Sequence, residues 1–191
     1  MAEKSTRKYE LLIIGGSAGS LEVILQVLPS VPKNFSLAIV IVLHRRGGES
    51  VLTELLTEKT VLPVKEVEEK DEILSGNVYI APADYHLLIE NDRTFSLDYS
   101  EKVNYSRPSI DVSFESAAEV YGNKLIGMLL SGANADGTEG LKRIKELGGL
   151  VVVQNPSEAS VSYMPQQALD DVQVDYVFDT NGIKHFFQKL K

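Results

Sequence analysis

Short apolar runs alternate with amphipathic stretches along this chain, and that alternation limits the folds open to it. Tyr9–Ile14 and Leu37–Leu43 are apolar almost throughout, which is typical of strands buried on both faces of a parallel sheet. Between them, apolar residues recur at helical spacing over Leu21–Leu28, and Pro29 ends that pattern. The alternation returns near the C-terminus, where we expect the following elements: strands at Leu125–Leu130, Leu150–Val153 and Tyr176–Phe178, a helix at Thr138–Leu147 and a terminal helix capped by Asn181.

The middle of the chain has a different pattern, with short β-branched runs separated by turns and little helical spacing. The elements expected there are a strand near Pro63–Val67, strands at Val78–Ala81, Leu87–Glu90 and Thr94–Tyr99, and a helix from Ile110 with Ser109 as its N-cap. The three later strands resemble a small antiparallel insertion. We therefore predict an α/β fold, a doubly wound and mostly parallel sheet with helices on both faces, in a single domain over residues 1–191.

Composition narrows the classes of function. The chain has 27 acidic and 19 basic residues, and a net charge of −8 argues against nucleic acid as a partner. It has no cysteine, which excludes a thiol nucleophile and a thiolate zinc site. The longest apolar run, Leu37–Leu43, is far shorter than the roughly 20 residues that cross a bilayer. We expect a cytoplasmic protein with no membrane insertion.

The loop after the first strand, Gly15–Gly19, reads Gly-Gly-Ser-Ala-Gly. A dinucleotide-binding fingerprint needs glycine where Ser17 stands, and a phosphate-binding P-loop needs a Gly-Lys ending that this loop lacks. The Gly-x-Ser-x-Gly spacing fits a nucleophile elbow, in which a tight strand-to-helix turn exposes the serine hydroxyl. Ser17 is therefore a candidate nucleophile, and the simpler alternative is a serine that only shapes or caps the turn.

A serine nucleophile needs a base, which is usually histidine. Of the three histidines, His185 lies in the terminal helix and is interpreted as a helix-face residue. His86 begins a strand of the insertion, where packing or substrate contact is expected. His44 directly follows a buried strand, and loops after parallel strands open on one edge of the sheet. His44 is therefore the candidate base for Ser17.

The candidate acid is Asp136, in the Gly-rich loop Ser131–Gly137 that follows another predicted strand. Its position predicts that it reaches the same sheet edge as Ser17 and His44. Alternatively, Asp136 only forms a turn, because Asp-Gly before a helix is a common turn sequence. Asp84, in the middle of the chain, is a weaker candidate for the acid. The order Ser, His, acid along the chain differs from the Ser, acid, His order of α/β-hydrolases.

Several long motifs, in order along nearly the whole chain, resemble the catalytic domain of the chemotaxis protein-glutamate methylesterases (CheB type). The matching stretches are Ile13–Gly19, Val42–His44, Val78–Leu87, Arg107–Val112, Leu130–Gly132 leading to Asp136-Gly137, Glu158–Ser160 and Met164-Pro165. The resemblance implies a Ser17, His44 and Asp136 triad. It also implies substrate-binding positions, which are Ala18, Arg107, Ala133 and Met164.

The implied activity is hydrolysis of γ-glutamyl methyl esters on methyl-accepting chemotaxis receptors or another methylated protein. Methanol is released, and deamidation of certain receptor glutamines is a related activity. No metal or organic cofactor is implied. The family's regulators carry a receiver domain before the catalytic domain, whereas here the first strand begins within about ten residues of Met1, so we expect no receiver domain.

Some positions depart from the family pattern. Ala18 stands where the best-known members have threonine, and Ala133 stands where methionine is frequent. After the base, Arg45–Gly48 replaces a Met-Pro pair, and its arginines with Arg107 could ring the site mouth and dock an acidic receptor helix. The departures and the missing receiver motivate an alternative, a non-catalytic signalling or scaffold module of the same fold. A third alternative is a nucleotide-binding domain, which only the Gly-rich loop supports.

Overall fold

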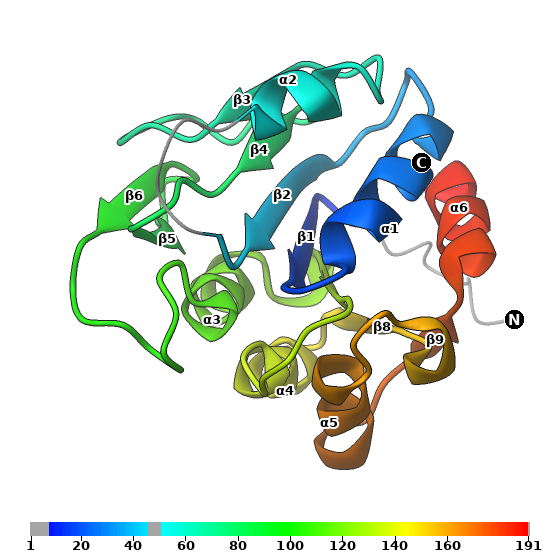
Figure 1. The fold of residues 1–191 in the computed structure, drawn as a ribbon. Coiled ribbons are helices and arrows are strands. Elements are labelled where there is room, and N and C mark those ends of the chain that lie inside the picture. The colour runs from blue at the N-terminus through cyan, green and yellow to red at the C-terminus, as the bar shows by residue number, and fades with distance from the viewer. Residues whose placement is uncertain (1–7, 46–50, 191) are drawn as a thin grey trace, which may run out of the picture.

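The computed structural model describes residues 8–45 and 51–190, and these form a parallel sheet between two layers of helices. Seven strands pair in parallel in the order β3-β4-β2-β1-β7-β8-β9, with β1 at the centre (Figure 1). The strands are β1 (Leu11–Gly16), β2 (Ala38–Leu43), β3 (Val64–Glu66), β4 (Val78–Ile80), β7 (Leu125–Leu129), β8 (Leu150–Gln154) and β9 (Tyr176–Phe178). The predicted doubly wound architecture is confirmed.

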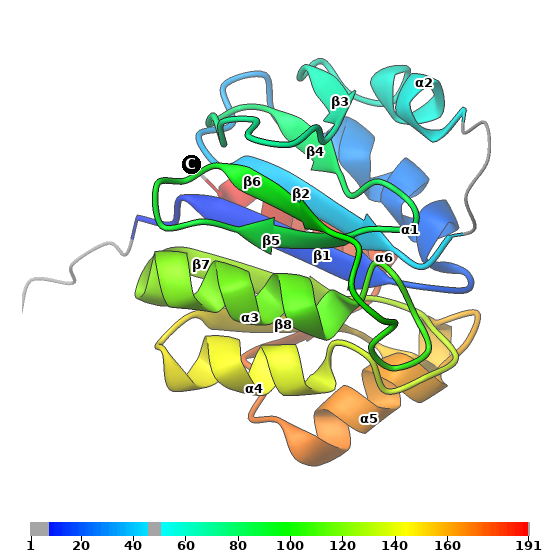
Figure 2. The same cartoon turned by 90° about the vertical axis from the view of Figure 1, so that its left-hand side faces the viewer.

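The helices divide between the two faces of the sheet. One face carries α1 (Ser20–Val27), the 3₁₀ turn η1 (Leu28–Ser30), α2 (Leu52–Thr57) and α6 (Thr180–Lys189). The other carries α3 (Ile110–Tyr121), α4 (Thr138–Glu146) and α5 (Tyr163–Asp171), and Figure 2 shows α3 and α4 in front of the lower part of the sheet. The 3₁₀ turn η2 (Gly122–Lys124) follows α3, and the 3₁₀ turn η3 (Pro156–Glu158) precedes α5. Alternate residues of β1 serve the two cores, with Leu11 and Ile13 facing α3 and α4 while Leu12 and Ile14 face α1 and α6. The continuous apolar runs reflect this double burial.

The predicted insertion is smaller than expected. The strands β5 (His86–Ile89) and β6 (Phe95–Asp98) form an antiparallel hairpin that packs on α3. The strand at Val78 was expected to join them, but β4 pairs in parallel with β2 and β3 in the main sheet. All three residues of β4 are buried, because helices and the hairpin cover both of its faces.

Two helix ends test the capping predictions. Ser109 caps α3 as expected, since its hydroxyl accepts a hydrogen bond from the Val112 N–H. The terminal helix begins earlier than predicted, because Asp179 is its N-cap and accepts from the Gly182 N–H at 2.6 Å, whereas Asn181 lies in the first turn. The sequence did not predict α5, and Pro165 fits there because it occupies the first helical turn, where an N–H needs no partner.

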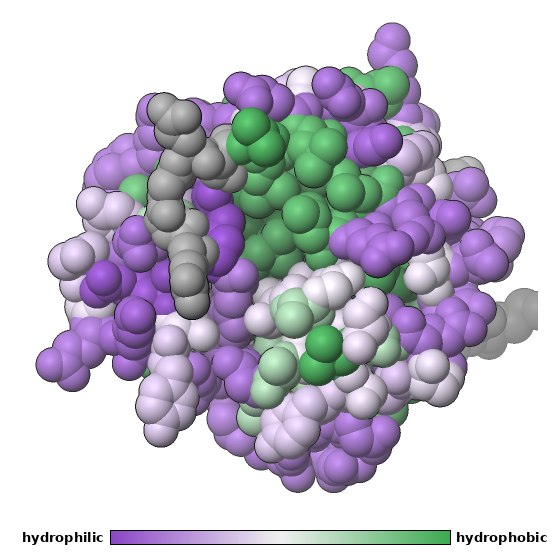
Figure 3. Space-filling view, viewed as in Figure 1, coloured by the Kyte–Doolittle hydropathy of each residue, from purple (hydrophilic) through white to green (hydrophobic). Residues whose placement is uncertain are grey.

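The molecular surface is uneven in polarity. Figure 3 shows a broad apolar area where Figure 1 draws α1 and α2, and a hydrophilic surface on the left, toward β5 and β6. Across the residues that the structure describes, no helix has the length and apolar character needed to span a membrane.

Candidate active site

Ser17 and His44 follow neighbouring strands at the carboxyl edge of the sheet. The β1–β2 register ends by pairing Gly16 with Leu43, so Ser17 and His44 come next on their two strands. The His44 N–H continues the ladder by donating to the Gly16 carbonyl at 3.2 Å. On the other side of β1, β7 leads into the loop that holds Asp136. The three predicted residues thus come from three adjacent strands.

His44 and Asp136 are directly hydrogen-bonded. The distance from His44 Nε2 to Asp136 Oδ2 is 2.6 Å, and Asp136 is fully buried while His44 keeps a little exposure. Because an ionised carboxylate only accepts hydrogen bonds, Nε2 carries the proton in the neutral imidazole. The other ring nitrogen, Nδ1, is then left with a lone pair that can accept a proton.

The Asp136 carboxylate sits on the N-terminus of α3. It accepts hydrogen bonds from the backbone N–H of Ile110 at 2.7 Å and of Asp111 at 3.0 Å. Side chains of Ser109 and Asn104 donate at 2.9 Å each. Burial alone would raise the pKa of Asp136, but the hydrogen bonds from His44, Asn104 and the backbone outweigh it and bring the pKa to about 2. Asp136 is therefore anionic throughout the neutral range.

A second buried carboxyl, Asp111, lies beside the first. It accepts from the Gly140 N–H at 2.7 Å and from the Asn104 amide at 2.8 Å, so Asn104 bridges Asp111 and Asp136. Burial raises the pKa of Asp111 to about 6, and the nearby negative charge of Asp136 adds to the increase.

The raised pKa of Asp111 predicts a pH-dependent stability. Between about pH 4 and pH 6 the folded chain binds more protons at Asp111 than the unfolded chain, so this group's contribution to the free energy of unfolding falls as pH rises. The loss over this range is roughly 2 kcal/mol, out of the roughly 3 kcal/mol that the full shift contributes at low pH. In urea titrations, the stability of Asp111→Asn relative to wild type should therefore increase from pH 4 to pH 6. A difference that is constant across this range would contradict the assignment.

The Ser17 loop is held at its backbone and leaves its hydroxyl available. The Ser17 N–H donates to the Ser131 carbonyl at 2.9 Å, and the Ser20 hydroxyl donates to the Ser17 carbonyl at 2.6 Å. Helix α1 begins at Ser20, so its N-terminus points toward the loop and favours negative charge there. Within the described ranges, the Ser17 hydroxyl forms no hydrogen bond, and the side chain is partly exposed. The contacts within the described ranges thus leave the hydroxyl uncommitted.

A pocket of about 360 Å³ opens beside His44. Its walls are His44, Arg45, Asp84, Lys102, Tyr105, Ser106 and Arg107. Arg45 donates to Glu66 and to the Ala81 carbonyl, so this arginine is held at the mouth. Asp84 lines the pocket but has no hydrogen bond to His44, whose carboxylate partner is Asp136. Arg46, Gly47 and Gly48 of the predicted rim lie outside the described residues.

Comparison with known proteins identifies the family. The family model for CheB methylesterase matches residues 12–187, which is nearly the whole chain. The chain belongs to the CheB methylesterase family. A crystal structure of the Thermotoga maritima CheB methylesterase catalytic domain superposes with a TM-score of 0.90 at 34% sequence identity, covering 96% of this chain and 100% of that one.

Two curated CheB-type relatives differ in length. A Leptospira interrogans protein named putative protein-glutamate methylesterase/protein-glutamine glutaminase is 50% identical over 185 residues, which span 95% of each chain. The Thermotoga maritima protein-glutamate methylesterase/protein-glutamine glutaminase is 37% identical over 172 residues, which are 88% of this chain and 50% of that protein.

The predicted substrate-side positions of this CheB-family chain fall into two groups. Ala18 and Ala133 are exposed on the loops after β1 and β7, and Arg107 lines the pocket. Met164 is fully buried instead, and its N–H donates to the Gly132 carbonyl at 2.9 Å. Met164 packs against Gly132, as its apolar gap-filling character suggests, and its assignment as a substrate-binding position stays a prediction.

Gly132 brings the β7 loop against the nucleophile loop. A Cβ at Gly132 would lie 3.0 Å from the Ser17 Cβ and 2.5 Å from the Cε of Met164, whose side chain is fully buried. We therefore expect Gly132→Ala to displace Ser17 and to lower kcat about ten- to a hundredfold. A Gly132→Ala/Met164→Val double variant removes the contact with the Met164 sulfur. It should recover part of the kcat that Gly132→Ala loses, with both variants measured by steady-state ester hydrolysis. Unchanged kcat in Gly132→Ala would show that this contact does not position Ser17.

Three further residues hold the site together. Sequence reasoning missed Gln154 and Asn104, whereas packing was one of the two roles expected for His86, whose side chain is buried. His86 accepts from the Ser109 N–H and hydrogen-bonds the Glu101 carbonyl, so it ties the hairpin to the start of α3. Gln154, at the end of β8, accepts from the Ser131 N–H at 2.9 Å. Asn104 holds both buried carboxyls. The only sequence signal for them was a polar side chain at a strand end or within a loop, which is too common to select a residue.

Proposed function

We propose that this chain is a serine hydrolase that demethylates γ-glutamyl methyl esters on methyl-accepting chemotaxis receptors in the cytoplasm and releases methanol. The observation that supports it best is the hydrogen-bonded His44–Asp136 pair next to Ser17, with the carboxylate fixed on the N-terminus of α3. The names of the Leptospira and Thermotoga relatives point to the same reaction. Ser17 acts as the nucleophile, His44 as the general base and then the general acid, and the Asp136 carboxylate orients His44 and stabilises its charged form.

Acylation begins when His44 Nδ1 takes the proton of the Ser17 hydroxyl, whose oxygen attacks the ester carbonyl carbon. The imidazolium that forms is stabilised by the Asp136 carboxylate across the 2.6 Å contact. The N-terminus of α1 and the backbone N–H of Ala133 stabilise the oxyanion of the tetrahedral intermediate. When the intermediate collapses, the methoxide leaves with the proton from His44, and methanol and an acyl-enzyme on Ser17 remain.

In deacylation, a water molecule takes the place that the Ser17 hydroxyl had in acylation. His44 takes a proton from water, the resulting hydroxide attacks the acyl carbonyl, and the protonated imidazole returns a proton to the Ser17 oxygen. The products are a glutamate side chain and free enzyme. A glutamine side chain would follow the same steps with ammonia as the leaving group, which accounts for a glutaminase activity with no additional residue.

The direct test is methanol release from a γ-glutamyl-methylated receptor fragment incubated with the purified chain, with ammonia release from the glutamine form measured in parallel. We expect both products from wild type, with methanol produced in proportion to the ester consumed. Stable binding of the methylated fragment without methanol would instead support the scaffold alternative and contradict the proposed hydrolase.

A further inference from the structure

We propose that the pocket beside His44 binds carboxylates that flank the ester in the substrate, so that the chain prefers a methylated glutamate within an acidic segment. This inference rests on the proposed function and adds a substrate specificity to it. It concerns the walls of the pocket other than His44, none of which takes part in the proton transfers.

The charge of the pocket is opposite to that of the molecule. Its walls carry three cations, Arg45, Lys102 and Arg107, and one carboxylate, Asp84, whereas the whole chain has a net charge of −8. Within the described ranges, neither Lys102 nor Arg107 forms a salt bridge. An acidic segment would be repelled by the rest of the surface, so these two unpaired charges provide local attraction at the site.

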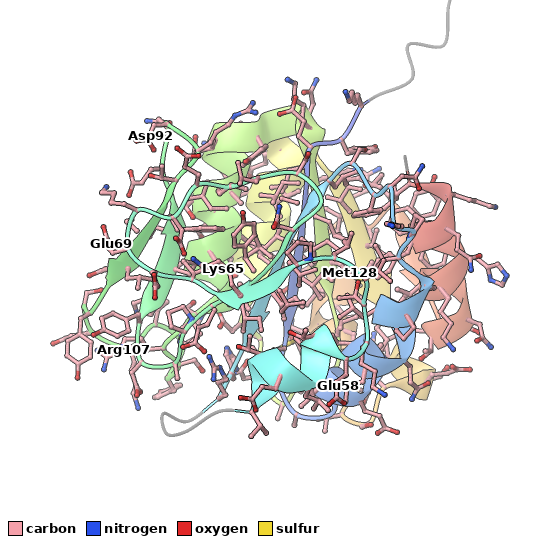
Figure 4. The ribbon with its side chains drawn as sticks, turned by 90° about the horizontal axis from the view of Figure 1, so that it is seen from above. Glu58, Lys65, Glu69, Asp92, Arg107 and Met128 are labelled. Atoms are coloured by element: carbon pink, nitrogen blue, oxygen red, sulfur yellow. The ribbon has the colours of Figure 1, made fainter. Side chains whose placement is uncertain are left out.

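Arg107 is held in place without being neutralised. Its guanidinium lies over the Tyr99 ring at 3.8 Å from the ring centroid, and its Nη1 donates to the carbonyls of Tyr99 and Ser100 at 3.2 and 2.8 Å. All of these partners are uncharged. The Asp98 carboxylate lies near enough for an electrostatic interaction with Arg107 but forms no salt bridge with it, so the guanidinium can still pair with a carboxylate of a ligand. Figure 4 shows Arg107 at the outer edge of the molecule. A preorganised arginine loses little side-chain entropy on binding a carboxylate.

The neighbouring tyrosines favour a polypeptide partner over a small ester. Tyr105 lines the pocket and is 96% exposed, so its ring contributes almost nothing to the core. Tyr85 and Tyr99 pack against each other at 5.5 Å between ring centroids and are also exposed. Exposed tyrosine next to arginine is the composition of protein-binding surfaces. The surface on this side is otherwise hydrophilic (Figure 3), which suits a charged segment.

His44 belongs both to the walls of this pocket and to the proposed catalytic residues. Because His44 is also a wall of the pocket, a residue bound there lies next to the position of the reacting ester. A polypeptide whose methylated glutamate reaches Ser17 would place its neighbouring side chains against Lys102 and Arg107. Carboxylates at those positions gain two charge-assisted contacts, which neutral side chains do not.

The test compares two peptides that differ only in the residues flanking a γ-methyl glutamate, glutamates in one and glutamines in the other. At low salt we expect kcat/KM for the acidic peptide to be about tenfold higher, mainly through KM. This preference should shrink in 0.5 M NaCl because salt screens exposed charges. Lys102→Glu should reduce the preference severalfold, whereas Lys189→Glu, the same charge change on α6, should leave it intact. Lys102 is exposed, so its replacement does not disturb the fold.

The outcomes separate this inference from the proposed function. Equal kcat/KM for the two peptides, or a preference that Lys102→Glu does not change, would overturn the specificity while leaving the esterase in place. Failure to hydrolyse either peptide, when a methylated receptor fragment is also not hydrolysed, would overturn the proposed function. Hydrolysis of the receptor fragment but of neither peptide would show that recognition requires a folded partner and would reject recognition by flanking carboxylates alone.

Discussion

Replacement of Ser17 by alanine is expected to lower the rate of methanol release about 10⁴-fold, to the level that the oxyanion donors support by themselves. The nearest other hydroxyl after β1, that of Ser20, is buried and donates to the Ser17 carbonyl, and the backbone contacts of Ser17 with Ser131 and Ser20 do not use the Ser17 side-chain oxygen. The fold should therefore survive the substitution. The measurement is methanol release from a methylated receptor fragment, with thermal unfolding of the same preparation recorded alongside.

A matched control for this substitution is Ser30→Ala, at the end of η1. It removes a hydroxyl that donates only to the Val27 carbonyl, three residues earlier. We expect full methanol release from Ser30→Ala. If Ser17→Ala retained the wild-type rate, the nucleophile would be a different group and the elbow would be only a structural turn.

Replacement of Asp136 by asparagine is expected to have a comparable effect on catalysis and an additional effect on stability. An amide cannot stabilise the imidazolium of His44, and loss of the acid in a serine triad costs on the order of 10⁴ in kcat. Asp136 accepts hydrogen bonds from five groups, so an NH₂ in place of one oxygen would face donors at the N-terminus of α3. Unpaired buried donors should cost roughly 1–3 kcal/mol of unfolding free energy.

The pH dependence of stability separates the two effects of Asp136→Asn. Because the pKa of Asp136 is lowered to about 2, the ionised carboxylate contributes stability that is complete above about pH 4 and is lost as pH falls through 2. The stability difference between wild type and the variant should therefore narrow below pH 4 in urea titrations. A variant with wild-type kcat would show that His44 works without the carboxylate, and a difference independent of pH would contradict the lowered pKa.

The sequence was most informative where parallel strands end. Continuous apolar runs predicted β1, β2 and β7, and the rule that such strands share one carboxyl edge was sufficient to bring Ser17, His44 and Asp136 to one place. The hydrogen bond between His44 and Asp136 agrees with that prediction. The role of Ser17 as nucleophile is a prediction that the Ser17→Ala variant tests.

Long-range polar contacts could not be predicted in the same way. Asn104 lies in a loop with no hydrophobic periodicity, and it takes a left-handed backbone conformation at φ 51° that no local motif announces. Asp111 falls in the first turn of the helix expected from Ile110, and no local signal marks it as buried, because its burial depends on α4 packing against α3. The burial of Met164 likewise depends on α5, a helix that the sequence did not reveal.

The loop between β6 and α3 has an inner side that stabilises the fold and an outer side that does not. Its Asn104 amide is committed to the buried carboxyls, whereas Lys102 and Tyr105 project from it without supporting the fold. Substitutions on the outer side can accumulate at little cost to folding or to the contacts of Asp136, while those on the inner side cannot. Members of the family could therefore diverge in the proteins that they recognise through a few exchanges in this loop, with their chemistry unchanged.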